Sequence, residues 1–373
     1  MKRFKVRIEI AVFIAVLLLT ALVCPAFAQF GGFEASQFEE PQNAADLTEM
    51  RQQIEDVTIP YQERLAVANK VKEITGRLPW TPMTSKEWNQ RLYEQKATVK
   101  RYQAAFPKLR CSETRYFLFA SDVPPQMYRE IQALLDRMYG VLCDKFNVPF
   151  VDPQQEQEGA PAVEKRNASK SKPVRKNIWQ AKCVVVVFMD ESDYNQFETR
   201  FFNQKVSSGT KGLCHQMLDG TVTITCKFNK DKFNMYSSLV HETTHGFSFM
   251  RRVAYPLPLW LNEGVSDWTA RTLVPQATTC PAKQKQAVAA MQKTHSLGGM
   301  FQATDHLDPW QYGAAAMTVN LLLKRNPGAF VNLIDDVKDG ADVEQTLIKY
   351  YNLDFAALAN LLGRACGIPG VKP

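Results

Sequence analysis

The stretch 241–267 reads HETTHGFSFMRRVAYPLPLWLNEGVSD, and it contains the residues that decide how this chain is interpreted. His241 and His245 are four positions apart, so on a helix their side chains lie on one face, one turn apart. Two imidazoles placed in this way can bind one metal ion, and Glu242 projects beside them as a candidate general base. The spacing therefore predicts a helix that carries an H-E-x-x-H metal motif.

A catalytic zinc ion needs a third protein ligand and an open coordination position. Glu263 follows His245 by 18 residues, beyond a turn that contains two prolines in the range 256–258. A second helix that begins near Asn262 would bring the Glu263 carboxylate back to the histidines. We therefore predict that His241, His245 and Glu263 bind Zn²⁺.

Asp267 lies four residues after Glu263 and shares its helix face. Histidines that bind a metal usually donate their other ring N–H to a carboxylate. We expect Asp267 to accept that bond from His241, and we expect Asn262 to support the ligands from the same segment.

Two phrases of this stretch resemble known zinc peptidases. The segment NEGVSD (262–267) is similar to the NEAISD that follows H-E-x-x-H in thermolysin, and PLWLNEG (258–264) resembles the third-ligand segment of bacterial peptidase-MA-like domains, which are related to aminopeptidase N. The resemblance covers about residues 112–360 and implies a gluzincin fold. The GxMEN substrate motif of aminopeptidase N enzymes is missing, so their specificity does not carry over.

The segment Tyr312–Ala316 (YGAAA) matches a turn at which the aminopeptidase N group places a tyrosine that binds the tetrahedral intermediate. The resemblance implies that role for Tyr312, because a phenol aimed at a developing oxyanion stabilises the transition state more than the ground state. The alternative is a tyrosine that only packs in the core or lies on the surface. Of the other histidines, His215 is a candidate for the cleft wall or for the surface, and His295 and His306 fall in a loop region.

The predicted chemistry is peptide hydrolysis. Zinc lowers the pKa of a bound water, Glu242 accepts its proton during attack on a peptide carbonyl, and Glu242 then passes the proton to the leaving amine. Three alternatives remain: an inactive zinc-binding module that mediates envelope or extracellular protein interactions, a structural protein with an accidental motif, and a hydrolase of a non-peptide amide.

The first 28 residues have the layout of a cleavable secretory signal. Four basic residues precede an apolar run, and the small-residue pattern Ala26-Phe27-Ala28 follows. We expect cleavage after Ala28, export to the periplasm or the extracellular space, and no stable membrane span afterwards. The signal carries a net charge of +3 of the total of +7. The remaining mild excess does not indicate a nucleic-acid partner, so the expected partner is a peptide or protein substrate.

The chain of 373 residues divides into three expected parts. They are a signal peptide (1–28), a helical N-terminal segment (29–110), and a peptidase-MA-like metallopeptidase domain (111–373) with a flexible polar insertion at 154–176. Within the last part, 115–119, 183–189 and 221–226 read as strands, 128–146 reads as a helix, and the chain is mainly helical from 235 onward.

The fold class that these elements predict is α+β, with a small mixed or antiparallel sheet beside a mainly helical lobe. The alternating segment TVTITC (221–226) is expected at the sheet edge, where an extended peptide could pair with it.

Seven of the eight cysteines lie beyond the signal. They form no paired Cys-x-x-Cys knuckles, which argues against a cysteine zinc site. Export permits disulfides, and Cys214 and Cys226 flank a predicted hairpin, so a disulfide between them is one possibility and buried free thiols are the other.

Overall fold

Strand β6 (Cys183–Phe188) lies at the centre of a five-stranded sheet in the computed structural model, which describes residues 44–151 and 174–373. All six of its side chains are buried, as expected for a β-branched run that is covered on both faces. The strands follow the order β2-β3-β6-β8-β7; the two central pairings are parallel and the two outer pairings are antiparallel. The other strands are β2 (Arg110–Glu113), β3 (Phe117–Ser121), β7 (Gly212–Gln216) and β8 (Val222–Lys227). The predicted α+β class with a small mixed sheet is confirmed.

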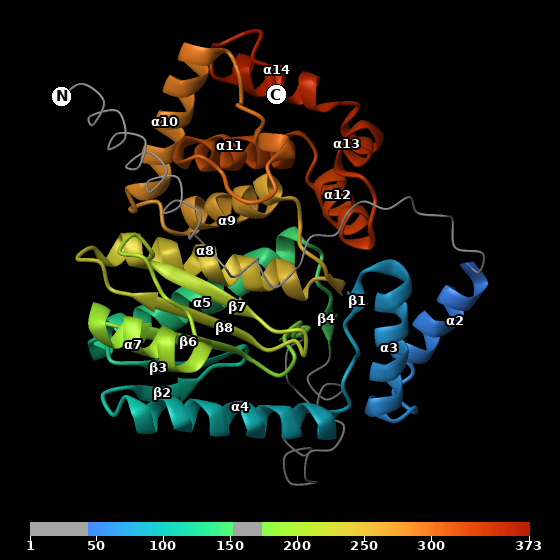
Figure 1. The fold of residues 1–373 in the computed structure, drawn as a ribbon, viewed down its shortest axis with the longest axis vertical. Helices are drawn as coiled ribbons and strands as arrows, with labels where there is room; N and C mark the ends of the chain where they lie inside the picture. The colour runs from blue at the N-terminus through green and yellow to red at the C-terminus, as the bar shows by residue number, and fades with distance from the viewer. Residues whose placement is uncertain (1–43, 152–173) are drawn as a thin grey trace, which may run out of the picture.

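Two hydrophobic cores lie on the two faces of this sheet, because side chains alternate along each strand. Phe119 and Val185 belong to the larger core, which also contains buried residues of α5 and α8. Leu118 and Val184 belong to the smaller core, with buried residues of α4 and α7. The sheet is thus the middle layer between two pairs of helices (Figure 1). These helices are α4 (Ser85–Ala105), α5 (Pro125–Lys145), α7 (Glu191–Phe202) and α8 (Lys232–Met250).

A helical lobe packs over the side of α8 that faces away from the sheet, and this lobe forms the upper part of Figure 1. The chain enters it through the short strand β9 (Val253–Ala254). The lobe consists of α9 (Leu259–Leu273), α10 (Thr279–Thr294), the 3-10 turn η3 (Met300–Gln302), α11 (Pro309–Arg325), α12 (Pro327–Asp339), α13 (Val343–Tyr351) and α14 (Phe355–Ala365). The mainly helical character predicted from residue 235 onward is confirmed.

The N-terminal segment is helical where it is described, and it packs on both cores. Its elements are α2 (Ala44–Glu55), α3 (Tyr61–Thr75), β1 (Leu78–Pro79) and α4. Ile54 and Ala68 join the larger core and Val99 joins the smaller one. Strand β1 pairs with β9, the short strand that follows helix α8 in the chain. The short segment between α3 and α4 therefore serves as a contact with the rest of the chain.

The prediction that TVTITC forms the sheet edge is wrong. Strand β8 pairs with β6 on one side and with β7 on the other, so β7 is the edge strand on this side. Alternation of side chains is the same for an interior strand and for an edge strand. The order of strands depends instead on how the chain crosses the sheet.

The cysteines are free thiols throughout the described residues. Cys214 lies opposite Ile224 and Cys226 lies opposite Gly212, so the two cysteines are diagonal neighbours in the β7–β8 pair. Diagonal neighbours have Cα atoms roughly 7–8 Å apart, whereas disulfides usually need about 4.4–6.8 Å. The register therefore does not favour the disulfide that the sequence left possible.

The signal segment (1–28) and most of the insertion (154–176) lie outside the described residues. The last part of the insertion differs from the prediction, because β5 (Val174–Arg175) pairs with β4 (Phe150–Val151) instead of forming a loop. Among the described helices, none is both long enough and apolar enough to span a bilayer.

Candidate metal centre

Helix α8 carries both predicted histidine ligands. It begins after Asp231, whose carboxylate accepts hydrogen bonds from the backbone N–H of Phe233 and Asn234 at 2.9 and 3.5 Å, and this cap stabilises the first turn. His241 and His245 follow in the third and fourth turns. Their rings are nearly perpendicular, at 87°, and their Nε2 atoms are 3.0 Å apart. The i, i+4 arrangement that the sequence predicts is confirmed.

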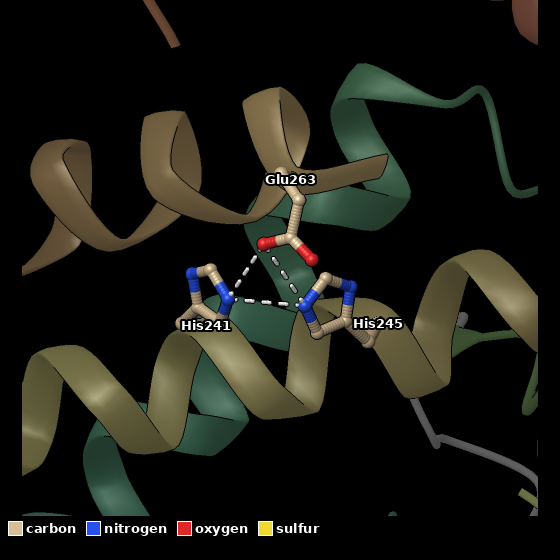
Figure 2. Close-up of side chains that lie close together, drawn as sticks. All are labelled: His241, His245 and Glu263. Atoms are coloured by element: carbon tan, nitrogen blue, oxygen red, sulfur yellow. Dashed lines mark hydrogen bonds and ion pairs between the residues drawn. The ribbon is translucent and has the colours of Figure 1, made fainter. Parts of the chain in front are cut away.

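Glu263 approaches the histidines from α9, which begins at Leu259, slightly earlier than predicted. Its Oε2 atom lies 3.2 Å from Nε2 of His241 and 3.6 Å from Nε2 of His245. The three side chains point toward one another from two facing helices (Figure 2). Within the described residues, His241, His245 and Glu263 are the group whose donor atoms converge closely enough to hold one metal ion.

The outer nitrogen of each imidazole has its own partner. Nδ1 of His241 lies 2.8 Å from Oδ1 of Asp267, which confirms the predicted contact. Nδ1 of His245 lies 3.1 Å from Oγ of Ser266. Ser266 donates its single hydroxyl proton to the carbonyl oxygen of Asn262 at 3.0 Å, so its oxygen must accept from His245. Asn262 therefore supports the centre through its backbone carbonyl.

These contacts decide which atoms face the centre. In the neutral imidazoles, with the proton of each on Nδ1, the two Nε2 atoms present lone pairs to each other and to the Glu263 carboxylate. Oε2 of Glu263 is buried and accepts no hydrogen bond, an arrangement that is unfavourable unless a cation supplies the missing partner. Tetrahedral zinc bonds of about 2.0–2.2 Å place ligand atoms roughly 3.4 Å apart. The observed separations of 3.0, 3.2 and 3.6 Å fit such an ion.

The electrostatics of the centre favour positive charge. Burial by itself lowers the pKa of His241, but Asp267 and Glu263 outweigh burial and hold that pKa well above its ordinary value. Burial raises the pKa of Glu263, but His245 and His241 outweigh it and hold that pKa below its ordinary value. The donor set is two imidazole nitrogens and one carboxylate, and the outer nitrogen of each imidazole is hydrogen-bonded. This is a donor set that catalytic zinc sites use.

Glu242 is a residue of helix α8, and its side chain approaches the edge strand β7. Its side chain is partly exposed, and its Cγ atom lies 3.1 Å from where a Cβ atom of Gly212 would be. Burial raises the pKa of the thiols of Cys214 and Cys226, and the Glu242 charge adds to this effect. The absent side chain at Gly212 thus leaves room for the side chain of Glu242 next to the sheet edge.

Tyr312 lies in the first turn of α11, and the Lys283 ammonium lies 4.8 Å from the centre of its ring. Lys283 also forms an ion pair with Asp267 at 2.8 Å. Two contacts therefore connect Tyr312 to the residue that holds His241. The catalytic role implied for Tyr312 stays a prediction.

The three other histidines do not join the centre. His215 lies on the face of β7 opposite to Gly212 and Glu242. There its Nε2 is 2.9 Å from the buried carboxylate of Glu198 and its ring stacks on Phe202. It therefore lines neither the cleft nor an open surface. His295 and His306 are exposed.

Sequence reasoning missed two residues of the site, Ser266 and Lys283. Ser266 lies inside the quoted NEGVSD segment, three residues after Glu263, so helix periodicity could have placed it on the same face. Lys283 lies on α10, and no spacing rule connects it to Asp267. Burial opposes the charge of Lys283, but Asp267 outweighs burial and raises the pKa of this lysine.

Comparison with known proteins adds no family to this geometry. No family model matches the chain, and no curated protein matches its sequence.

Proposed function

We propose that this chain is a zinc-dependent peptidase of the gluzincin type. The observation that carries the proposal is the convergence of His241, His245 and Glu263, with the outer nitrogen of each imidazole already hydrogen-bonded elsewhere. The three donor atoms lie within 3.6 Å of one another, and both imidazoles are oriented by hydrogen bonds from outside the cluster. A metal centre requires this arrangement.

Each residue of the centre has a proposed task. His241, His245 and Glu263 hold the ion, and zinc supplies Lewis acidity that polarises a carbonyl and lowers the pKa of water. Glu242 accepts the proton of the attacking water and then donates it to the leaving amine. Its position supports this task, because its side chain packs against the edge strand at Gly212 and it directly follows the proposed ligand His241 in the chain.

Tyr312 is proposed to donate a hydrogen bond from its phenol to the developing oxyanion. The support is positional: its ring packs against Lys283, which is bound to Asp267 beside the centre. The role itself derives from the resemblance to the aminopeptidase N group.

The substrate is proposed to be an extended peptide that adds to strand β7. This strand pairs only with β8 in the five-stranded sheet, and helix α8 packs against both of them. An unpaired strand edge presents a row of backbone donors and acceptors, which a peptide can satisfy by β-augmentation. We also propose export of the protein, which rests on its first 28 residues alone.

The test is cleavage of a diverse peptide mixture by the zinc-loaded protein and by its Glu242→Gln variant. The variant keeps the size of the side chain and all three proposed ligands but removes the base. We expect zinc to stay bound and cleavage to fall by about 10²–10⁴-fold. Zinc content is measured on the same samples, and cut sites are identified by mass spectrometry.

An active Glu242→Gln protein would contradict the mechanism. Firm zinc binding without cleavage by either protein would favour the zinc-binding module instead. A wild-type protein that binds no zinc would refute the metal centre.

A further inference from the structure

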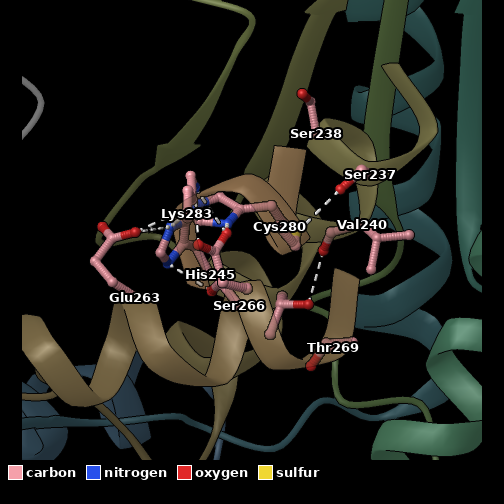
Figure 3. A network of polar contacts seen from close by, with 12 residues as sticks. Ser237, Ser238, Val240, His245, Glu263, Ser266, Thr269, Cys280 and Lys283 are labelled. Atoms are coloured by element: carbon pink, nitrogen blue, oxygen red, sulfur yellow. Dashed lines mark hydrogen bonds and ion pairs between the residues drawn. The ribbon is translucent and has the colours of Figure 1, made fainter. Parts of the chain in front are cut away.

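Lys283 lies where three helices of the lobe meet. It belongs to α10, and its Nζ atom contacts both carboxylate oxygens of Asp267 on α9, at 2.8 and 3.1 Å. Oδ1 of Asp267 also accepts the bond from Nδ1 of His241 on α8. Figure 3 shows Lys283 beside the residues of the metal centre. The Asp267 carboxylate thus joins His241, a proposed metal ligand, to Lys283, which lies 16 residues after Asp267 in the chain.

The charge of Asp267 needs this lysine. Asp267 is only 3% exposed, and a buried carboxylate is costly unless a cation pairs with it. A histidine that binds a metal ion through Nε2 and donates a hydrogen bond from Nδ1–H to a carboxylate is neutral. As a metal ligand, His241 therefore cannot balance the negative charge of Asp267. Lys283 is the cation that contacts Asp267 in the described part of the chain.

The backbone around Lys283 is held by α11. Gly313 packs so closely on α10 that an added Cβ atom would lie 2.2 Å from the carbonyl oxygen of Lys283 and 2.4 Å from its carbonyl carbon. The ring of Tyr312, the residue before Gly313, packs against the Lys283 ammonium. Both ends of the lysine are therefore located by α11, which limits how far its side chain can move.

We propose that Lys283 is a positioning residue of the metal centre: it balances and orients Asp267, which in turn orients His241 for the ion. The inference rests on the proposed metal centre. Lys283 touches neither the ion nor the substrate, so its effect is on metal affinity in the first place.

The first measurement is the zinc affinity of the purified protein, obtained by competition with a chromophoric chelator. In Lys283→Met the charge of Asp267 loses its partner, and we expect the affinity for Zn²⁺ to fall about 10–100-fold, the range for partners that orient a ligand. Lys283→Arg keeps the charge and should restore most of the affinity. The matched control is Lys285→Met, on the same helix at an exposed position, with unchanged affinity.

The second measurement separates positioning from general stability by a double-mutant cycle. Asp267→Asn removes the carboxylate, and Asp267→Asn with Lys283→Met removes both charges, so neither a buried carboxylate nor an unpaired lysine remains. If Lys283 acts through Asp267, the double variant binds zinc as tightly as Asp267→Asn. Thermal unfolding of the metal-free proteins records any change in the fold.

Three outcomes would overturn the inference. Wild-type zinc affinity in Lys283→Met would show that the ion pair does not support the centre. A further loss of affinity in the double variant would show that Lys283 does not act through Asp267, and this comparison holds even where Lys283→Met alone fails to fold. Absence of zinc binding by the wild-type protein would refute the metal centre itself, and the inference with it.

Discussion

Ser266 shows how a single proton decides the state of the centre. Its hydroxyl donates to the carbonyl oxygen of Asn262, so it can only accept from His245. That bond keeps the proton of His245 on Nδ1 and leaves Nε2 free for a metal ion. Asp267 has the same effect on His241, but with a full negative charge.

Replacement of Ser266 by alanine tests this reasoning. Nδ1 of His245 then loses its acceptor, and we expect zinc affinity to fall about 10-fold, at the lower end for loss of a ligand's partner because the bond is neutral. A chelator competition titration measures the change. Ser238→Ala is the matched control, since Ser238 on α8 also donates to the carbonyl four residues back but forms no hydrogen bond to a histidine among the described residues. Equal affinity in Ser266→Ala and wild type would contradict the assignment.

At the scale of elements, the end of helix α8 is held by a buried lysine. Lys338 on α12 is 1% exposed, and its Nζ atom donates to the carbonyl oxygens of Phe249 and Tyr255 at 3.4 and 2.5 Å. No carboxylate hydrogen-bonds to it within the described residues. Burial, with Arg251 nearby, lowers its pKa to about 7.

The pKa of Lys338 predicts how stability changes with pH. Between about pH 7 and the pKa of a free lysine near 10.4, the unfolded chain keeps this proton while the folded protein releases it. Stability contributed by this group therefore rises with pH, by up to about 1.4 kcal/mol per unit. Lys338→Met removes this rise, so the free energy of unfolding of the wild type relative to the variant should increase from pH 7 to pH 9. Denaturant unfolding at several pH values measures it, and parallel profiles would contradict the pKa.

For the whole molecule, a bound ion would join the sheet-packed helix α8 to the helical lobe. His241 and His245 come from α8 and Glu263 comes from α9, so unfolding of either helix destroys the site. Zinc should then stabilise the folded chain by about 2.7 kcal/mol at a concentration 100 times its dissociation constant.

Thermal unfolding with and without zinc measures this stabilisation. We expect the unfolding temperature to rise with zinc and to return to its metal-free value after chelation. Glu263→Gln keeps the size of the side chain but weakens the ligand, and it should abolish most of the shift. An equal shift in both proteins would mean that zinc binds elsewhere.

Local spacing was enough to predict the core of the site. His241 with His245, and Glu263 with Asp267, each follow from i, i+4 neighbours on one helix, because helix geometry is the same wherever the helix lies. Strand β6 and helix α8 were predicted for a similar reason. A β-branched apolar run indicates a strand, and residues spaced at the helical period indicate a helix, within a short stretch of sequence.

Contacts between distant elements could not be predicted in this way. The edge position of β7 depends on the crossover of the chain, which side-chain alternation does not encode, and TVTITC was misplaced for that reason. His215 could not be assigned to the face of Glu198 without the strand register.

The sequence by itself determined which side chains can hold a metal ion and which carboxylate lies beside them, since these depend on helix periodicity within 27 residues. Only the tertiary structure decided that Lys283 neutralises Asp267 and that β7 is the free strand next to Glu242. Both depend on which elements pack together. Because Gly313 has no side chain, α11 packs closely on α10 at Lys283, and because Gly212 has none, Glu242 has room beside β7. Close packing of whole elements, a property of the folded chain, sets these distances.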